Sequence, residues 1–303
     1  MLSPEAVAAV EQAALETPVH TPGYDVAGAR ARARELAAQQ PREEVAHVVD
    51  LDADGVRCRA YRPSTVQPGV VLHLHGGGFV FNDVDVHDSS ARRLANRTGR
   101  TVLSVDYRLA PEHPFPAAPD DVDTVLAWLE RVGAEHGLEG PLLGHGDSAG
   151  ANLALVAALR HPGAFSALAL IYPFLDPTAG FDSHRTETAG FDPRDVAWYW
   201  AQYVGGDATH LTDPDLAPLL SDRLATLPPT FVMTSEHDPL RGEGEHLARL
   251  IAQQGVPVLA TRYLGQVHGF WRHPAVFPSA EPLMLQVAAF LDAHATPTEH
   301  PGA

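Results

Sequence analysis

The most informative stretch of this chain is Gly144-His145-Gly146-Asp147-Ser148-Ala149-Gly150. We interpret the residues before it, Pro141 to Leu143, as the end of a buried strand, and the alanine-rich residues from Ala149 to Arg160 as a helix. A serine between two glycines at such a junction predicts a nucleophile elbow, in which a strand turns sharply into a helix and holds the hydroxyl at the tip. Glycines flank the serine because side chains at these positions would collide with neighbouring backbone.

Composition narrows the class of protein. The 303 residues are enough for one large α/β domain, and 45% of them are apolar, as in ordinary globular proteins. No apolar run approaches the length of a membrane span and no signal peptide is visible, so we expect no stable membrane insertion and a cytoplasmic location. The net charge of −17 would repel nucleic-acid phosphates, so no nucleic-acid partner is expected. Cys58 is the only cysteine, which excludes an internal disulfide.

Strand and helix patterns alternate along most of the chain, which predicts a mostly parallel central sheet with helices on both faces. Strands are expected over 44–51, 55–62, 70–75 and 101–107, and after the serine over 166–172, 230–235 and 257–263. Helices are expected over 120–136, 149–160, 242–254 and 282–293, and the polar tail 294–303 is expected to be frayed.

Two segments break this alternation, a helical one over 2–40 and an aromatic-rich one over 176–223. We expect them to pack together as a cap over the carboxyl ends of the strands, where such sheets bind ligands. The chain is then a single domain over 1–303, with a cap from about 1–42 and 177–224 and a core from about 43–176 and 225–295. Four aromatic residues of the second segment fit either the hydrophobic core or an apolar pocket under the cap: Trp198, Tyr199, Trp200 and Tyr203.

A nucleophilic serine needs a base, an acid that orients the base, and N–H donors for the developing oxyanion. His75-Gly76-Gly77-Gly78 follows a predicted strand and matches a glycine-rich oxyanion loop. Glycine suits this task because its backbone N–H can face a substrate without a side chain in the way. Together with the N–H of Ala149, two of these glycines would form a hole with three donors. The alternative is a plain glycine-rich turn.

The base is expected to be a histidine that follows a late strand. The sequence holds 17 histidines, so position along the chain has to decide. His268 follows the strand predicted over 257–263, whereas His246 falls inside a predicted helix and His273 lies further along the chain. His268 is therefore the expected general base.

The acid is expected to follow the preceding strand. Asp238 occupies this place after the strand predicted over 230–235, and the rival Glu236 is expected to extend that strand. The order Ser148, Asp238, His268 is the order of α/β-hydrolase triads. In such a triad the histidine takes the serine proton, and the aspartate fixes the histidine tautomer and stabilises the imidazolium.

Five motifs occur in a fixed order along the chain: His75-Gly76-Gly77-Gly78, Asp106-Tyr107-Arg108-Leu109-Ala110-Pro111-Glu112, Gly146-Asp147-Ser148-Ala149-Gly150, Asp238-Pro239-Leu240-Arg241 and His268-Gly269-Phe270. Together they resemble the bacterial hormone-sensitive-lipase-like esterases, a branch of the α/β-hydrolase fold, over nearly the whole chain. Two positions depart from the family pattern: Ala151 stands where a further glycine is common, and Gly242 where an acid is common. Neither departure removes a reacting group.

The resemblance implies an α/β-hydrolase fold with a helical cap, and serine carboxylesterase activity on esters of short to medium acyl chains. The catalytic residues would be Ser148, Asp238 and His268, and the oxyanion donors would be Gly77, Gly78 and Ala149. The resemblance further implies a small-molecule ester as the substrate, and no metal or organic cofactor. A homodimer is compatible with the sequence. Amides and formamides stay open as substrates, because the same triad serves them.

Other functions explain fewer of these residues. The spacing Gly144-x-Gly146-x-x-Ala149 also satisfies a dinucleotide-binding fingerprint, but that fingerprint usually opens a domain, and about four strands are expected before it here. A non-catalytic ligand-binding protein on a hydrolase scaffold is a further alternative, although such a protein would be expected to lack a triad member. His73 and His75 alternate on one strand face like a metal pair, yet no third ligand shows metal-like spacing.

Overall fold

The structure is a computed structural model that describes residues 1–295. The expected fraying of the tail therefore falls, beyond Ala295, outside the described residues. A central sheet contains β1 (His47–Ala53), β2 (Val56–Arg62), β3 (Val70–Leu74), β4 (Thr101–Val105), β5 (Leu142–Asp147), β6 (Ala167–Ile171), β7 (Thr230–His237) and β8 (Val258–Val267).

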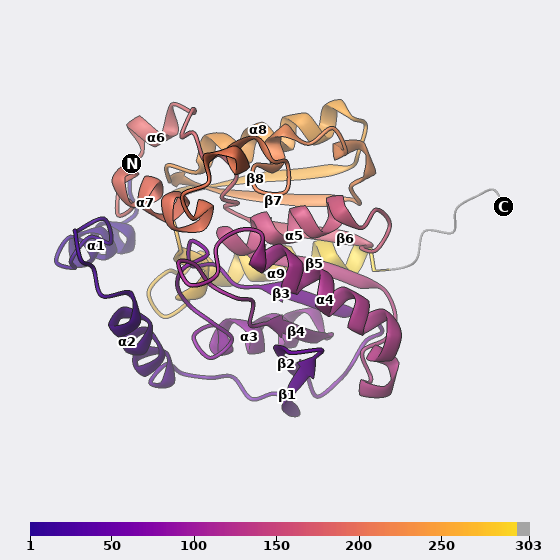
Figure 1. Cartoon of the computed structure of the whole chain (residues 1–303). Helices are drawn as coiled ribbons and strands as arrows, with labels where there is room; N and C mark the ends of the chain where they lie inside the picture. The colour runs from indigo at the N-terminus through magenta and orange to yellow at the C-terminus, as the bar shows by residue number, and fades with distance from the viewer. Residues whose placement is uncertain (296–303) are drawn as a thin grey trace.

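The strands of the sheet lie in the order β1-β2-β4-β3-β5-β6-β7-β8 (Figure 1). The pairs β1/β2 and β2/β4 are antiparallel, and all other neighbours are parallel. This mostly parallel sheet confirms the fold class expected from the alternation of strand and helix patterns.

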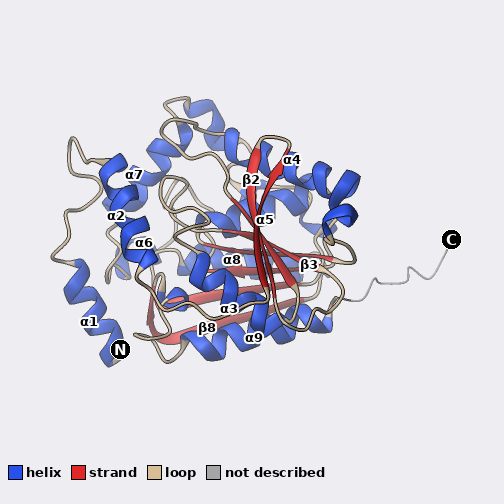
Figure 2. Ribbon diagram, turned by 90° about the horizontal axis from the view of Figure 1, so that it is seen from below, coloured by secondary structure: helices blue, strands red, loops and turns tan. Residues whose placement is uncertain are grey.

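Helices cover both faces of the sheet, as Figure 2 shows. One face packs against α3 (Asp88–Thr98) and α9 (Ala280–Ala293), and the other against α4 (Ala117–Val132), α5 (Ala149–Arg160) and α8 (Arg241–Gln253). Alternate residues of β3 enter the two apolar layers, with Leu72 on the α5 side and Val71 on the α3 side. The middle strands β3 and β6 are therefore mostly apolar and fully buried, because both of their faces are covered.

The remaining helices lie over the carboxyl ends of the strands: α1 (Pro4–Ala13), α2 (Val26–Ala38), α6 (Ser183–Thr186) and α7 (Pro193–Val204). The N-terminal segment and α7 contact each other, because His20 Nδ1 lies 2.6 Å from an oxygen of Asp195 and the Tyr24 ring packs edge-on against Trp198. The side chain of Arg30 also donates to the carbonyls of Val80 and Ala110 in the core. The two segments that break the alternation thus meet above the sheet.

The expected elements occur close to their expected bounds, and α5 spans Ala149–Arg160 as expected. β5 differs from the expectation that residues 141–143 end a strand. Leu142 and Leu143 instead begin β5, which continues to Asp147. α3 has no counterpart in the expectation, since its sequence contains few apolar residues. Its buried face includes Arg93, which the pattern does not identify as core and which forms an ion pair with Glu281.

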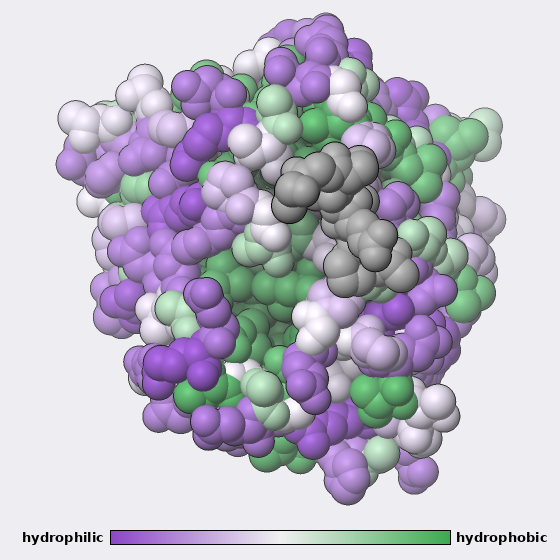
Figure 3. All heavy atoms as spheres, turned by 90° about the vertical axis from the view of Figure 1, so that its right-hand side faces the viewer, coloured by the Kyte–Doolittle hydropathy of each residue, from purple (hydrophilic) through white to green (hydrophobic). Residues whose placement is uncertain are grey.

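The surface is mostly hydrophilic on the face shown in Figure 3, with apolar residues inside a hollow. A cavity of about 460 Å³ lies at the amino ends of β3 and β5, where Val70, Leu126 and Leu142 are among its lining residues. This is the end of the sheet opposite to Ser148. Within residues 1–295 the helices are all too short or too polar to cross a lipid bilayer.

The junction between β5 and α5 depends on a very close approach to β3. A Cβ on Gly150 would overlap the carbonyl oxygen of Leu74, and a Cβ on Gly146 would overlap the carbonyl of Gly150. Backbone atoms cannot move aside as a flexible side chain can. The two glycines of the elbow are therefore required by the packing of α5 against the sheet.

We expect Gly150→Ala to lower the free energy of unfolding by about 3 kcal/mol or more, because the new methyl group forces α5 away from β3. Gly180→Ala is the matched control, since its Cβ would meet only side-chain oxygens at 3.3 Å. That control should change stability by less than about 1 kcal/mol. Urea denaturation measures both. A Gly150→Ala variant as stable as the wild type would contradict this account of the elbow.

Buried histidines in contact with one another connect the sheet to the start of α3, beside the elbow. His73 of β3 and His145 of β5 are register partners, and their Nδ1 atoms lie 2.9 Å apart. His73 Nε2 lies 3.4 Å from Nδ1 of His87, whose Nε2 lies 2.7 Å from the guanidinium of Arg272. Burial lowers the pKa of all three histidines, that of His145 to about 3. The rings are therefore neutral in the folded protein at ordinary pH.

These lowered pKa values make the fold sensitive to acid. Below about pH 6.5, each ring binds a proton in the unfolded chain but not in the folded chain. The free energy of unfolding is therefore highest above that pH and decreases as the pH falls below it. His145→Asn removes one such group and keeps a polar atom near the Nδ1 position. Below about pH 5.5, the wild type should lose about 1.4 kcal/mol per pH unit more than this variant. Equal slopes in urea denaturation series would show that His145 does not titrate differently in the two states.

Candidate active site

Ser148 lies at the tip of the turn between β5 and α5. Its φ of 54° and ψ of −118° fall in a region that residues with a side chain rarely adopt. The surrounding backbone holds it there, since Ser148 N–H donates to the carbonyl of Ile171 and its carbonyl accepts from the N–H of Phe174. A strained backbone fixed on both sides presents the hydroxyl at the carboxyl end of the sheet.

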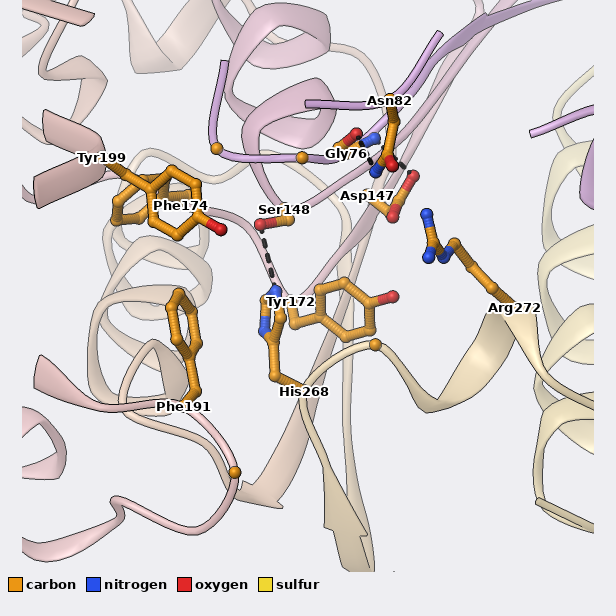
Figure 4. Close-up of a pocket in the computed structure, with 14 residues that line it drawn as sticks. Gly76, Asn82, Asp147, Ser148, Tyr172, Phe174, Phe191, Tyr199, His268 and Arg272 are labelled. Carbon is orange, nitrogen blue, oxygen red and sulfur yellow. Dashed lines mark hydrogen bonds between the residues drawn. The ribbon is translucent and has the colours of Figure 1, made fainter. Parts of the chain in front are cut away.

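His268 and Asp238 lie in line with the Ser148 hydroxyl. His268 Nε2 is 3.1 Å from Ser148 Oγ (Figure 4). On the other side of the ring, His268 Nδ1 is 2.8 Å from Asp238 Oδ2. An ionised carboxylate only accepts hydrogen bonds, so Nδ1 carries the proton and Nε2 is left to accept from Oγ. Asp238 is fully buried, and its other oxygen accepts the N–H of Leu240.

The residues that compete for these positions lie elsewhere. Glu236 is part of β7, as expected, and its side chain accepts the N–H of Gly265 at 2.7 Å. His246 lies on α8, where it packs against Phe181. His273 follows a short turn of 3-10 helix, and burial lowers its pKa to about 4. The structure brings none of the three within hydrogen-bond distance of Ser148.

The glycine-rich loop lies beside the serine. Gly76, Gly77 and Gly78 line the same cavity as Ser148, and Gly77 and Gly78 have φ values of 133° and 61°, which favour glycine. A Cβ on Gly78 would overlap the Tyr199 ring. Ala149 is the first residue of α5, so its N–H has no acceptor within the helix. Each expected oxyanion donor thus lies next to Ser148, either along the chain or across the cavity.

The cavity around Ser148 has a volume of about 210 Å³ and two different sides (Figure 4). The apolar side is formed by Phe174, Phe191 and Tyr199. The Phe191 ring also packs against the His268 ring, with 4.9 Å between the ring centroids. The polar side consists of Asn82, Asp147, Tyr172 and Arg272.

Among the four aromatic residues left open by the sequence, Tyr199 lines the cavity, and Trp200 and Tyr203 are buried in the core.

The polar side of the cavity is not apparent from the sequence. Asp147 accepts the N–H of Gly76 at 2.9 Å, and burial raises its pKa while the nearby Arg272 opposes that shift. In sequence, Asp147 is only the variable residue of the elbow motif, and Arg272 follows His268 without any recognisable pattern. Their roles depend on contacts between distant segments.

Two buried groups have enough ligand atoms close together for a cation to be considered. The first contains His73, His87 and Asp147. The sequence pattern paired His73 with His75 and connected it with neither His87 nor Asp147. Arg272 donates to His87 Nε2, so the proton of His87 stays on Nδ1, the atom that a metal would need. In the second group, Asp176, His184 and Glu243, the Glu243 oxygens already accept the N–H groups of residues 175 and 176. Neither donor set fits a metal ion well.

Comparisons with known proteins agree with this architecture. A family model described as alpha/beta hydrolase fold matches residues 71–272. The esterase LipI of Mycobacterium tuberculosis is 35% identical over 266 residues, which is 83% of each chain, and the ethyl acetate hydrolase of Pseudomonas putida is 32% identical over 80% of each chain. A solved structure of an esterase from the bacterial hormone-sensitive lipase family has a TM-score of 0.85 and 25% identity, covering 97% of this chain and 99% of that chain.

These matches span most of the chain and include the segments that carry the five motifs. They confirm the family resemblance and the enzyme class that it implied. The chain belongs to the hormone-sensitive-lipase-like branch of the α/β-hydrolase fold and is a carboxylic ester hydrolase.

Proposed function

We propose that this hydrolase cleaves esters of short to medium acyl chains through an acyl-enzyme formed on Ser148. His268 acts as the general base, and Asp238 orients it. The proposal depends on one observation, the unbroken line of hydrogen bonds from Ser148 Oγ through His268 to Asp238. Proton transfer in the transition state requires this contact between nucleophile and base. The buried carboxylate of Asp238 holds His268 in the tautomer whose Nε2 can accept the proton.

Acylation begins when Ser148 Oγ attacks the ester carbonyl carbon while His268 Nε2 takes the hydroxyl proton. The carbonyl electron pair moves onto its oxygen, which becomes the oxyanion of a tetrahedral intermediate. When the carbonyl reforms, the bond to the alcohol oxygen breaks and His268 donates its proton to that oxygen. Asp238 remains ionised throughout and stabilises the imidazolium.

Deacylation repeats these steps with water as the nucleophile. His268 Nε2 takes a proton from water as the water oxygen attacks the acyl carbonyl carbon. The second tetrahedral intermediate collapses with cleavage of the bond to Ser148 Oγ, which recovers its proton from His268. The products are a carboxylic acid and the free enzyme.

The oxyanion of both intermediates would be held by the N–H groups of Gly77, Gly78 and Ala149. Supporting this assignment, the two glycines line the cavity beside Ser148, and Ala149 begins a helix whose N-terminal end favours negative charge. Such donors contribute most when they are fixed before the reaction starts, and losing one typically costs about 10²–10³ in turnover.

The cavity supports a preference for small acyl groups. Its volume of about 210 Å³ is below the usual range for drug-sized ligands, and aromatic rings close one side. We propose that segments 1–42 and 177–224 form a cap that supplies this closure, since Phe191 and Tyr199 belong to the second segment. The similarity to an ethyl acetate hydrolase agrees with a short ester.

One alternative, a different class of substrate, stays open. Amides and formamides could be cleaved by the same arrangement, and comparing an ester with the anilide of the same acid decides between them. A non-catalytic ligand-binding role is disfavoured by the hydrogen-bonded alignment of all three triad residues.

Ser148→Ala should reduce turnover of p-nitrophenyl acetate by about 10⁴-fold or more, because it removes the nucleophile and leaves the fold intact. Ser104→Ala is the matched control, since Ser104 is a buried serine of β4 that does not line the cavity. The control should keep wild-type rates. If Ser148→Ala retains more than about one hundredth of the wild-type rate, Ser148 is not the nucleophile.

A further inference from the structure

The oxyanion donors are oriented through the opposite ends of their own peptide groups. A trans peptide is planar, so its C=O and N–H point in opposite directions and turn together. The N–H of Gly77 shares a peptide with the carbonyl of Gly76. In the same way, the N–H of Gly78 is coupled to the carbonyl of Gly77, and the N–H of Ala149 to that of Ser148. Fixing each carbonyl therefore fixes the direction of the corresponding donor.

Backbone groups fix two of these three carbonyls. The carbonyl of Gly77 accepts the N–H groups of Val80 and Phe81 at 3.1 and 2.8 Å. The carbonyl of Ser148 accepts the N–H groups of residues 151, 152 and 174 at 3.0, 3.2 and 3.2 Å. These two donors are held by the course of the main chain itself, so no single side chain controls their direction.

Side chains fix the third carbonyl, that of Gly76. It accepts from Asn82 Nδ2 at 2.9 Å (Figure 4). It also accepts from His75 Nδ1 at 3.0 Å. A carbonyl oxygen can only accept, so the amide group of Asn82 that faces it is the NH₂. His75 is itself held by stacking on Tyr107, with 4.2 Å between ring centroids. Asn82 lines the cavity and is half-buried.

The peptide between Gly76 and Gly77 needs such support more than an ordinary peptide does. Both of its flanking residues are glycines, which lack the Cβ that restricts backbone rotation. The N–H of Gly76, one peptide earlier, is fixed by Asp147. The carbonyl side is fixed by Asn82 and His75. Without the Asn82 contact, this peptide has more freedom to rotate, and the N–H of Gly77 would turn away from the oxyanion.

We infer that Asn82 is a positioning residue for ester hydrolysis, which directs the Gly77 N–H at the oxyanion by holding the Gly76 carbonyl. This inference rests on the proposed function. Asn82 touches no reacting atom. Its effect belongs to the transition state, because the oxyanion exists only after attack by Ser148.

Asn82→Gly tests this role with little disturbance of the backbone, because Asn82 has a φ of 69°, which glycine adopts freely. We expect kcat for p-nitrophenyl acetate to fall about 10-fold or more, with KM within about twofold of the wild type and an unchanged melting temperature. Asn82→Asp should lose more, because a carboxylate cannot donate to the carbonyl and repels it. The control is Asp54→Gly, at a φ of 53° in an exposed turn between β1 and β2, and it should keep wild-type kinetics.

A second measurement separates positioning from a general structural role. A trifluoromethyl ketone forms a hemiketal oxyanion with the serine, whereas the matching methyl ketone binds mainly without reaction. In Asn82→Gly, the inhibition constant of the trifluoromethyl ketone should rise by the same factor by which kcat/KM falls. The inhibition constant of the methyl ketone should stay constant.

Three results would overturn the assignment of Asn82: a kcat of Asn82→Gly within twofold of the wild type, a loss that appears in KM with unchanged affinity for the trifluoromethyl ketone, or an Asn82→Gly protein that does not fold. Failure of the proposed function looks different. In that case the wild type itself shows no ester turnover, or turnover persists in Ser148→Ala.

Discussion

The close approach of α5 to β3 is the constraint on which the rest of the site depends. Gly150 lies directly against the carbonyl of Leu74, so the serine at the start of α5 and the glycine-rich loop after β3 have to share one small region. A hydrogen bond from Gly76 N–H to Asp147 ties the two segments together at that point. The interior of the sheet therefore places Ser148 and the glycine-rich loop, whereas Phe191 and Tyr199 of the overlying segment line the cavity on its apolar side.

Burial has two opposite uses around this centre. Burial of His73, His87 and His145 keeps these rings neutral. The rings can therefore hydrogen-bond to one another without placing a charge in the interior. Asp238 is also fully buried, but it is surrounded by donors, the N–H of Leu240 and the His268 ring. A buried carboxylate with its hydrogen bonds satisfied holds a histidine more rigidly than an exposed one does. The same low-dielectric interior thus keeps the three buried histidines neutral and holds His268 in a fixed orientation.

The sequence predicts those features that depend on local patterns. The bounds of α5, the mostly parallel sheet and the family follow from glycine spacing, alternation and motif order, and the structure and the comparisons confirm them. The sequence does not reveal α3, because Arg93 lies on its buried face and is paired with Glu281, 188 residues away. The contact of Asn82 with Gly76 is close in sequence, but it requires a turn whose conformation no pattern specifies. The division into cap and core stays a prediction.

The most direct test of the account is to trap the covalent intermediate. An ester that deacylates slowly, such as p-nitrophenyl trimethylacetate, is mixed with the enzyme, quenched in acid at short times, and the digested protein is examined by mass spectrometry. The account predicts one acyl group per molecule on the peptide that contains Ser148, appearing at the rate of the p-nitrophenol burst. Acylation of a different residue, or continued hydrolysis with Ser148 unmodified at every time point, would contradict it.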